Sequence, residues 1–450
     1  MFVERNIRMN MMAIEKLYEL YIKYPYVTID TRKVFEDVIF FGVGSKNKFG
    51  VHRGCQFAEE ALAAGAAYVI INDPVLKAAH QDDPRWIFVD DCELCLQQLA
   101  RYHREQLNIP IVAIAGSNGK TTTRALMELV LSQKYRCFAT PGNLNNHLGV
   151  PLSLLKINAT HEIAVLEVGA NHIGETLFLC RLVQPTYGLV TNCGKDHLGE
   201  YGSFENVIKA NKELYDYFET AGGLVFVNGR DDILMEISAQ CPQRIIYGDD
   251  ENTLRGEVLH SPMLEMRIWI NEESRDVKTA LFGDFWRDAV LTAAQVGYQF
   301  GLSIDQIKWA IEAYRPDALR SELIEWNGHS VLLDCYNANP SSMEVFIRAT
   351  QSSPEVPKIL ILGEMLELGE YTEEEHQYLL DKVIDEKRFD KILLVGAEFS
   401  KINLPKNSKI KHFESTLLAQ RWWSSQVFIQ GGCIYVKGSR GNKLETLFGR

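Results

Sequence analysis

Long apolar runs and an excess of positive charge are both absent from this sequence of 450 residues. No stretch approaches the roughly 18 consecutive apolar residues that a membrane-spanning helix needs. The first ten residues lack the apolar core of a signal peptide, so we expect a cytoplasmic chain without a membrane span. Lys and Arg total 47 against 59 Asp and Glu, a net charge of -12. Because binding to a nucleic acid backbone needs clustered cations, this balance argues against a nucleic acid partner.

Cysteine is sparse as well, with 9 residues spread over the whole length. An odd number at wide spacing is typical of reduced, buried thiols rather than of a disulfide framework. Cys92 and Cys95 form the one close pair, on an amphipathic segment with no second Cys or His pair nearby. We therefore expect this pair to pack in the core rather than to bind metal or carry out redox chemistry.

A phosphate-binding loop is the most informative feature that the sequence does contain. Apolar residues 109–115 run directly into a glycine-bounded loop, and an amphipathic helix pattern follows. The glycines would let the backbone approach an anion closely, Lys120 supplies positive charge, and Thr121 can bind Mg²⁺. This pattern predicts a site for ATP or GTP. Its members are Gly116, Ser117, Asn118, Gly119, Lys120, Thr121 and Thr122.

The pattern of strands and helices divides the chain into three α/β segments. Residues 1–107 predict a small α/β domain. Residues 108–314 alternate apolar runs with helices, which predicts a mostly parallel sheet covered by helices on both faces. Residues 315–450 predict a second doubly wound domain. The expected strands are 38–43, 68–71, 86–89, 163–168, 187–192, 223–228, 330–334, 358–363, 391–395 and 432–437, and the expected helices include 57–66, 341–351 and 373–386.

Two side chains that follow apolar runs are candidate metal ligands. Glu167 ends the run 163–166, and His197 comes shortly after the run 188–192. In parallel α/β sheets the carboxyl ends of the strands meet at the edge where ligands bind. One carboxylate oxygen and one imidazole nitrogen make a partial shell for a second Mg²⁺ or Mn²⁺. A salt-bridging or helix-capping role for Glu167 remains open.

The asparagine-rich stretch 141–151 is a candidate substrate-binding turn. The amide side chains of Asn145 and Asn146 can donate to and accept from a polar ligand without adding charge. A purely turn-forming role is the alternative, because Asn and Gly favour turns by themselves.

These motifs together resemble the Mur ligase family, the ATP-dependent ligases of peptidoglycan synthesis. The stretches 116–122, 167–172 and 192–198 occur in the family's order and approximate spacing. Tyr336-Asn-Ala-Asn-Pro340 resembles the branch that adds D-alanyl-D-alanine to UDP-N-acetylmuramoyl-tripeptide. Further stretches similar to that branch are 29–32 with Phe40 and Phe41, 334–343, 362–370 with His376, and 437–440.

The resemblance implies a three-domain α/β architecture. It consists of a small UDP-substrate-binding domain (1–107), a central ATP-binding domain with a P-loop ATPase-like parallel sheet (108–314) and a Rossmann-like C-terminal domain that binds the incoming dipeptide (315–450). The implied reaction uses ATP and Mg²⁺ to phosphorylate the terminal carboxylate of the UDP-linked tripeptide. The amine of D-alanyl-D-alanine then attacks the acyl phosphate. We expect a monomer whose domains close on one another.

The resemblance also assigns roles to individual residues of this chain. Lys120, Glu167 and His197 would be catalytic, with Thr121, Glu167 and His197 at the metal. Arg320 and Asp334 would lie near the base and ribose of ATP. The remaining assignments are Asp30, Thr31 and Arg32 to the uridine nucleotide, Asn145 and Asn146 to substrate, Asn337 and Asn339 to the dipeptide, and Lys437, Ser439 and Arg440 to phosphate or the peptide carboxylate.

The chain departs from the family pattern at two places. Many members carry a lysine that CO₂ converts to a metal-binding carbamate, but Asn211 occupies that register here and Lys212 is one residue late. A shift of one residue on a helix turns a side chain by about 100°, so we do not expect a carbamate. The second departure is the adenine-binding stretch 283–289, which lacks the family's histidine and asparagines. Stacking on Phe285 or Trp286 could replace them, or ATP could bind weakly.

Two other functions remain open at the level of the sequence. One is another ligase of the superfamily, such as folylpolyglutamate synthase or a ligase for a different amino acid. The other is an ATP-binding homologue with weakened catalysis. The third residue of the tripeptide, diaminopimelate or lysine, has no local signature in the chain.

Overall fold

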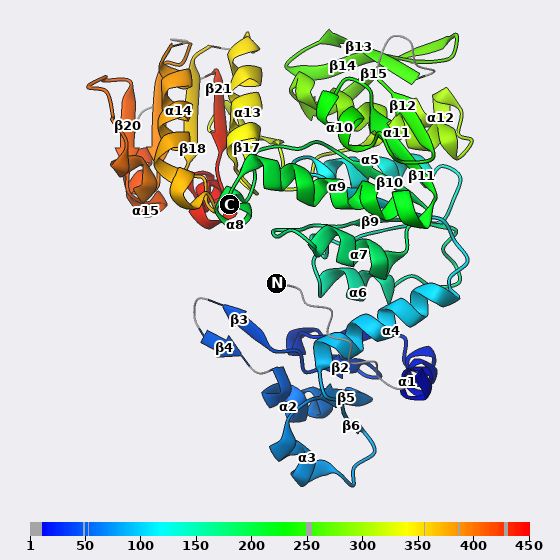
Figure 1. Cartoon of the computed structure of the whole chain (residues 1–450). Coiled ribbons are helices and arrows are strands. Elements are labelled where there is room, and N and C mark those ends of the chain that lie inside the picture. Colours follow the sequence, from blue (N-terminus) through cyan, green and yellow to red (C-terminus); the bar gives the residue numbers. More distant parts are fainter. Residues whose placement is uncertain are drawn as a thin grey trace.

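The computed structural model describes residues 11–47, 50–52, 54–248, 254–354, 356–385, 388–426 and 431–450. Three mainly parallel sheets with their helices make up most of it (Figure 1). The N-terminal sheet lies at the bottom of the view, the central sheet above it, and the C-terminal sheet at the upper left. The predicted α/β class is confirmed. No helix among these residues is long and apolar enough to cross a bilayer.

The N-terminal sheet has four parallel strands in the order β1-β2-β5-β6. Helix α4 packs on it and continues toward the central sheet, and Cys92 and Cys95 on this helix are buried, which confirms the expected core packing. The elements are α1 (Met11–Lys23), β1 (Val27–Thr28), η1 (Thr31–Lys33), β2 (Ile39–Phe41), β3 (Ser45–Asn47), β4 (Gly50–His52), η2 (Gly54–Phe57), α2 (Ala58–Ala63), β5 (Tyr68–Ile71), α3 (Pro74–His80), β6 (Trp86–Phe88) and α4 (Cys92–Gln106).

The central sheet is parallel throughout, in the order β12-β11-β10-β7-β9-β8. Strand β7 is buried on both faces, because Ile111 and Ala113 pack with helices of one side and Val112 and Ile114 with helices of the other. The elements are β7 (Ile111–Ala115), α5 (Lys120–Leu131), β8 (Cys137–Ala139), α6 (Gly149–Leu154), β9 (Ile163–Glu167), α7 (Glu175–Val183), β10 (Tyr187–Val190), α8 (Leu198–Tyr201), α9 (Phe204–Ala221), β11 (Leu224–Asn228), α10 (Asp232–Ile237) and β12 (Arg244–Tyr247).

A separate antiparallel sheet, β13-β14-β15, was not foreseen from the sequence. Its strands are β13 (Leu254–His260), β14 (Met263–Ile270) and β15 (Glu273–Phe282). Side chains of β14 alternate between buried and more exposed, the period-two signal of a sheet with one covered face. The elements η3 (Asp284–Trp286), α11 (Arg287–Gln299) and α12 (Ile304–Ala313) follow it.

The C-terminal sheet has the order β16-β17-β21-β18-β19-β20 and is parallel except for the edge strand β16. Its two faces are covered by separate groups of helices (Figure 1). The elements are β16 (Glu322–Trp326), β17 (His329–Asp334), α13 (Pro340–Ser352), β18 (Lys358–Gly363), η4 (Gly369–Tyr371), α14 (Thr372–Asp385), β19 (Lys391–Val395), η5 (Ala397–Lys401), β20 (Ile410–Phe413), α15 (Thr416–Trp423), β21 (Cys433–Lys437), η6 (Arg440–Asn442) and η7 (Leu444–Phe448).

Candidate functional site

A cleft of about 1250 Å³ lies at the carboxyl edge of the central sheet, between that sheet and the C-terminal sheet. Most of the candidate residues line it, although they come from distant parts of the sequence. They are Ser117, Asn118, Gly119, Lys120, Thr121, Thr122, Asn145, Asn146, Glu167, His197, Arg320, Asp334, Asn337, Lys437, Ser439 and Arg440. Gly116 and Asn339 lie just behind this lining, and Asp30, Thr31 and Arg32 lie outside it, in the N-terminal part.

The phosphate loop has the backbone that its glycines predict. Gly116 and Gly119 have φ values of 125° and 82°, in the left-handed region that favours glycine. A Cβ atom on Gly116 would stand 2.1 Å from Thr191 Oγ1, so the close approach of these two segments also requires glycine. Lys120 folds back so that its Nζ donates to Gly116 O. The loop therefore places its amide groups and a lysine at the start of α5, as an anion site requires.

Glu167 is almost fully buried and is held by three polar neighbours. Its Oε1 accepts from Arg124 Nε at 3.0 Å, and its Oε2 accepts from Thr121 Oγ1 at 3.3 Å and from Asn145 Nδ2 at 3.5 Å. The ion pair that the sequence left open is thus present, with Arg124 as the partner. Sequence reasoning missed Arg124, although its position four residues after Lys120 places both on the same side of α5.

The Thr121 hydroxyl and the Glu167 carboxylate fit a Mg²⁺ ion in kind, because Mg²⁺ prefers oxygen ligands. Both face the cleft next to the phosphate loop. Within the described ranges, no three His, Cys, Asp or Glu residues come together as a ready metal cluster. A metal here would therefore depend on hydroxyl, substrate and water oxygens as well as on Glu167.

His197 makes its charged contacts away from Glu167. Its Nδ1 atom lies 2.7 Å from Glu367 Oε2 and 3.4 Å from Glu200 Oε2. Burial lowers the pKa of His197, but the close contact with the Glu367 carboxylate outweighs it and leaves this pKa raised, although Nδ1 has no hydrogen bond of good geometry in the described part of the chain. The same contact lowers the pKa of Glu367. The joint metal-binding role of Glu167 and His197 stays a prediction.

On the opposite wall, Lys437 and Asp334 form an ion pair. Lys437 Nζ lies 2.6 Å from Asp334 Oδ2 and 3.3 Å from the backbone oxygen of Asn337, and only 4% of the Lys437 side chain is exposed. The Arg320 guanidinium stacks on the Tyr336 ring at 3.6 Å from its centroid. This wall therefore combines the Arg320 cation, stacked on an aromatic ring, with the Asp334 carboxylate, which is paired with Lys437.

Three further candidate residues make contacts that stabilise the fold. Asn339 caps α13, and its Nδ2 donates to Asn118 Oδ1 at 2.8 Å, which ties the C-terminal part to the phosphate loop. Ser439 Oγ donates to Glu364 O at 3.1 Å. Arg440 Nη1 pairs with Glu445 Oε1 at 2.5 Å. Direct ligand contact by these three residues stays a prediction.

The remaining candidates stabilise local turns. Asn146 Oδ1 accepts from the backbone N–H of Leu148 at 3.2 Å and of Gly149 at 2.9 Å, at the start of α6. Asp30 caps the short helix η1 and pairs with Arg32 at 2.8 Å. The turn-forming alternative for the asparagine-rich stretch is therefore realised at Asn146, which also lines the cleft.

Asn211 and Lys212 both point their polar groups back to α9. Asn211 is buried, and its Nδ2 donates to Val207 O at 3.0 Å. Lys212 Nζ pairs with Asp216 and lies 3.5 Å from Glu219 Oε1. Neither residue lines the cleft. Lys212 thus does not take the place of a lysine at position 211.

Two aromatic residues occupy the stretch that departs from the family's adenine-binding pattern. Phe285 and Trp286 line the cleft with ring centroids 5.2 Å apart. A Cβ atom on Gly119 would lie 3.5 Å from Trp286 Cζ3, so this indole stands beside the phosphate loop. The Trp286 Nε1 atom is buried without a hydrogen-bond partner in the described part of the chain.

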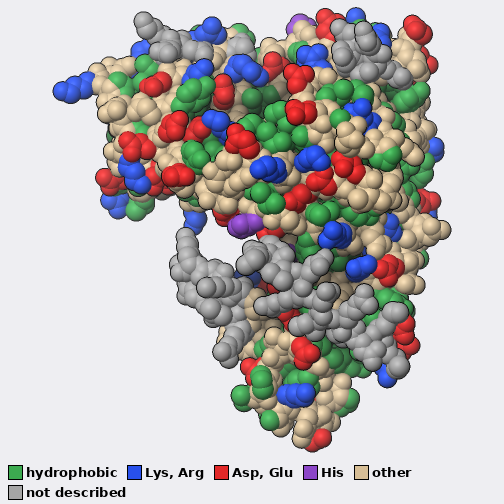
Figure 2. Space-filling model, viewed as in Figure 1, with side chains coloured by type: hydrophobic (Ala, Val, Ile, Leu, Met, Phe, Trp, Pro, Cys, Tyr) green, Lys and Arg blue, Asp and Glu red, His purple; other side chains and the backbone are tan. Residues whose placement is uncertain are grey.

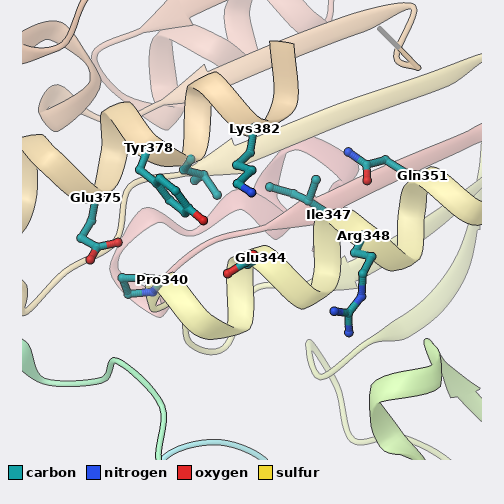
Figure 3. A pocket seen from close by; sticks show the side chains of 9 residues that line it. Pro340, Glu344, Ile347, Arg348, Gln351, Glu375, Tyr378 and Lys382 are labelled. Atoms are coloured by element: carbon teal, nitrogen blue, oxygen red, sulfur yellow. The ribbon is translucent and has the colours of Figure 1, made fainter. Parts of the chain in front are cut away.

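A second cavity of about 180 Å³ lies between α13 and α14 (Figure 3). Glu344, Tyr378 and Lys382 are among its lining residues. Figure 3 shows that Arg348 points away from α14, and this arginine also lines the main cleft. On the face shown in Figure 2, basic and acidic side chains are intermixed without a broad basic patch.

Family models match most of the chain. Residues 114–297 match the Mur ligase middle domain, and residues 319–440 match the Mur ligase, glutamate ligase domain. The UDP-N-acetylmuramoyl-tripeptide--D-alanyl-D-alanine ligase of Bacillus subtilis is 30% identical over 430 residues, covering 94% of this chain and 92% of that protein. The Escherichia coli ligase of the same name is 29% identical over 428 residues, with the same coverage of 94% and 92%.

Solved structures give the same assignment of fold. MurF from Acinetobacter baumannii superposes with a TM-score of 0.82 at 27% identity, covering 94% of this chain and 92% of that chain. The MurF ligase from Thermotoga maritima in complex with ADP gives a TM-score of 0.80 at 23% identity, covering 94% and 96%. The three-domain architecture expected from the resemblance is thus confirmed.

Proposed function

Because this chain belongs to the Mur ligase family, we propose that it joins D-alanyl-D-alanine to UDP-N-acetylmuramoyl-tripeptide at the expense of ATP. The observation that carries the proposal is the shared cleft, in which the phosphate loop and Glu167 face Asp334 and Lys437. The similarity to D-alanyl-D-alanine ligases over 94% of the chain supports the choice of substrates.

The chemistry requires activation, because a carboxylate is a poor electrophile. A carboxylate oxygen of the tripeptide attacks the γ-phosphorus of ATP, the bond to the bridging oxygen breaks, and ADP leaves. The dipeptide amine then attacks the acyl carbon, loses a proton and expels inorganic phosphate, which leaves an amide. Electrostatic stabilisation and positioning are the main contributions a protein makes to such transfers.

The central sheet supplies the phosphate-binding half of this site in our proposal. The loop amides, Lys120 and a Mg²⁺ on Thr121 would hold the β- and γ-phosphates, and Glu167 and His197 would hold a second Mg²⁺. When bound, these ions would neutralise charge on the phosphates and on the attacking carboxylate. Arg124 orients the buried Glu167 carboxylate through their 3.0 Å contact.

The C-terminal residues complete the site from the other wall. Arg320 and Asp334 lie near the base and ribose of ATP, and Asn337 and Asn339 shape the dipeptide end. Lys437, Ser439 and Arg440 serve phosphate or the peptide carboxylate. Asn145 and Asn146 contact substrate at the central sheet. Residues 1–107, 108–314 and 315–450 form the UDP-substrate, ATP and dipeptide domains, with Asp30, Thr31 and Arg32 at the uridine nucleotide.

We further infer that metal binding proceeds without a carbamoylated lysine. Asn211 stands in the expected register with its amide bonded to its own helix, and Lys212 is paired with Asp216. Asn211 at the expected lysine position, together with the aromatic pair Phe285 and Trp286, favours a second candidate function. In this alternative the chain is an ATP-binding homologue with weakened catalysis.

Omission of single components separates these candidates. Phosphate release is measured with ATP, Mg²⁺, UDP-N-acetylmuramoyl-tripeptide and D-alanyl-D-alanine, and each component is left out in turn. The proposal predicts release that depends on all four. Release that does not need the dipeptide would contradict it, and nucleotide binding without release would establish the weakened homologue. Tripeptides with diaminopimelate or lysine at the third position, tested side by side, identify the natural substrate.

A further inference from the structure

The stretch Leu362–Glu370 crosses from the C-terminal sheet to the segment that carries His197. It leaves the end of β18, and Figure 1 shows α8 lying against this part of the molecule. Glu367 makes two contacts there. Its carboxylate Oε2 lies 2.7 Å from His197 Nδ1, and its backbone oxygen accepts from Gly199 N–H at 2.9 Å. One residue thus contacts the 197–199 segment through both side chain and backbone.

Both partners of the ion pair have a left-handed backbone. The φ value is 67° at Glu367 and 46° at His197. Residues other than glycine adopt this region uncommonly, and they keep it only where the surroundings fix it. Such positions cluster at functional sites. Two of them in direct contact indicate that the structure holds this particular pair in place.

The loop that carries Glu367 is fixed from behind by two residues. His376 Nε2 accepts from Met365 N–H at 3.0 Å, while its Nδ1 faces Thr372 O at 2.7 Å. Ser439 Oγ accepts from Leu366 N–H at 3.3 Å and donates to Glu364 O at 3.1 Å. The backbone that leads to Glu367 is therefore held in place, while about half of the Glu367 side chain is exposed, at 51%.

The contact surface around the pair is closely packed. Leu198 and Tyr201 are buried in the same apolar cluster as Met365 and Leu368. A Cβ atom on Gly199 would stand 2.8 Å from Gly369 N, so the two backbones meet at a distance that only glycine allows. The Glu367 contact therefore exists only while this edge of the C-terminal part is docked on the central part.

We propose that Glu367 is a positioning residue for the ligation, and this role rests on the proposed function. Its carboxylate pairs with the His197 ring at Nδ1 through a 2.7 Å charged contact that lacks the angle of a good hydrogen bond, and this contact leaves Nε2 as the nitrogen available to the cleft. A carboxylate on one ring nitrogen orients the ring and determines which nitrogen is free to bind or accept. Docking of the C-terminal part and correct placement of His197 are thereby the same event.

The test compares Glu367→Ala and Glu367→Gln with two matched controls. Glu200→Gln changes the other carboxylate near His197 Nδ1, at 3.4 Å. Tyr371→Phe removes the hydroxyl that donates to Gly202 O at 2.8 Å, a single contact between the same two parts, and leaves the Glu367 carboxylate and the packed surface around it in place. We expect Glu367→Ala to lower kcat by about 10- to 100-fold, the range for loss of such supporting carboxylates. KM for ATP should change much less, Glu367→Gln should retain part of kcat, and both controls should stay within about twofold of it.

A second readout follows the ring itself. In protein labelled with ¹⁵N-histidine, the signals of His197 are assigned by their loss in His197→Gln. We expect a proton on Nδ1 in the unaltered protein, altered nitrogen shifts in Glu367→Ala, and unchanged shifts in Glu200→Gln. If Glu367→Ala does not fold, the smaller change in Glu367→Gln gives the same comparison.

The outcomes distinguish failure of the proposed function from failure of the positioning role of Glu367. Absence of ligation in the unaltered protein would overturn the proposed function. Folded Glu367 variants with unchanged His197 shifts and unchanged kcat would overturn the positioning role alone. A lower melting temperature with unchanged shifts would make Glu367 merely structural and would also overturn it.

Discussion

Three charged candidate residues of the cleft each have a partner of opposite charge. Glu167 is paired with Arg124, Asp334 with Lys437, and His197 with Glu367. The motif residues themselves could be predicted from the sequence, because each follows a strand or a phosphate loop. Their partners could not, since Arg124 has no motif of its own and Glu367 meets His197 only through the fold. Lys120 differs from these residues, because its Nζ donates to the backbone oxygens of Gly116 and Ser117 and has no carboxylate partner among the residues that the structure describes.

Lys120→Ala tests the phosphate role of this lysine at the residue scale. Removing a charge that stabilises the transferred phosphoryl group costs about 10²- to 10³-fold in rate, so we expect phosphate release to fall by at least that factor. Lys212→Ala is the matched control, because Lys212 is paired on α9 and does not line the cleft. Release that is unchanged in Lys120→Ala, or abolished in Lys212→Ala, would reverse the assignment of the two lysines.

At the scale of helices and strands, the apolar pattern was a reliable guide where strands are buried on both faces. The strands Tyr68–Ile71, Lys358–Gly363 and Lys391–Val395 begin and end where they were expected. The antiparallel sheet β13-β14-β15 was missed, because alternating residues such as those of Met263–Ile270 carry few continuous apolar runs. Polar residues at the starts of helices were also ambiguous, since capping and ligand binding use the same side chains.

Asn146 at the start of α6 illustrates that ambiguity and allows a test. Asn146 Oδ1 accepts two backbone hydrogen bonds in the turn that leads into α6, and a hydrogen bond contributes about 1 kcal/mol to stability. Asn146→Ala should therefore lower the free energy of unfolding by about 1 kcal/mol, measured by urea denaturation. Asn146→Asp keeps the accepting oxygen and should retain most of the stability. If Asn146→Asp instead raises KM for the UDP substrate strongly while folding normally, Asn146 binds substrate as well as stabilising the turn.

Helix α4 contains a buried histidine that makes stability depend on pH. His103 contacts Ile157 O at 2.7 Å and Tyr18 OH at 3.1 Å. Burial lowers the pKa of His103, and the bond to Ile157 offsets only part of this effect. In the unfolded chain His103 therefore takes up a proton near pH 6.5, whereas in the folded chain it takes up that proton only at a lower pH.

The free energy of unfolding should accordingly be highest above about pH 6.5 with respect to this group. It should fall on acidification by at most about 1.4 kcal/mol per pH unit for this one proton. We expect His103→Gln to lose less stability between pH 7 and pH 5 than the unaltered protein. Melting temperatures measured across this pH range supply the comparison. Equal losses of stability in the two proteins would show that His103 does not contribute to the pH dependence.

On the scale of the whole molecule, the C-terminal part is docked on the central part by several polar contacts. Lys195 Nζ lies 2.6 Å from Glu375 Oε1, and its backbone N–H donates to Ser341 Oγ at 2.8 Å. Asn339 reaches Asn118 in the phosphate loop. These polar contacts surround the apolar contact of Leu198 and Tyr201 with Met365 and Leu368. Movement of one part against the other is a common way for domains to close around ligands.

Small-angle scattering tests closure directly. We expect the radius of gyration to fall when a non-hydrolysable ATP analogue and UDP-N-acetylmuramoyl-tripeptide are added together, because both walls of the cleft then have a ligand to hold. Lys195→Ala should weaken the change by removing the pair with Glu375. An unchanged radius at saturating ligand would mean that the domains do not close on substrate.

The central claim is that a tripeptide carboxylate attacks the γ-phosphoryl group of ATP in this cleft, and oxygen transfer measures it most directly. The tripeptide is labelled with ¹⁸O in its terminal carboxylate and converted with ATP, Mg²⁺ and D-alanyl-D-alanine. The account predicts one ¹⁸O atom in each inorganic phosphate released, because the attacking carboxylate oxygen leaves with the phosphate. Release of unlabelled phosphate during amide formation would contradict an acyl phosphate and with it the proposed mechanism.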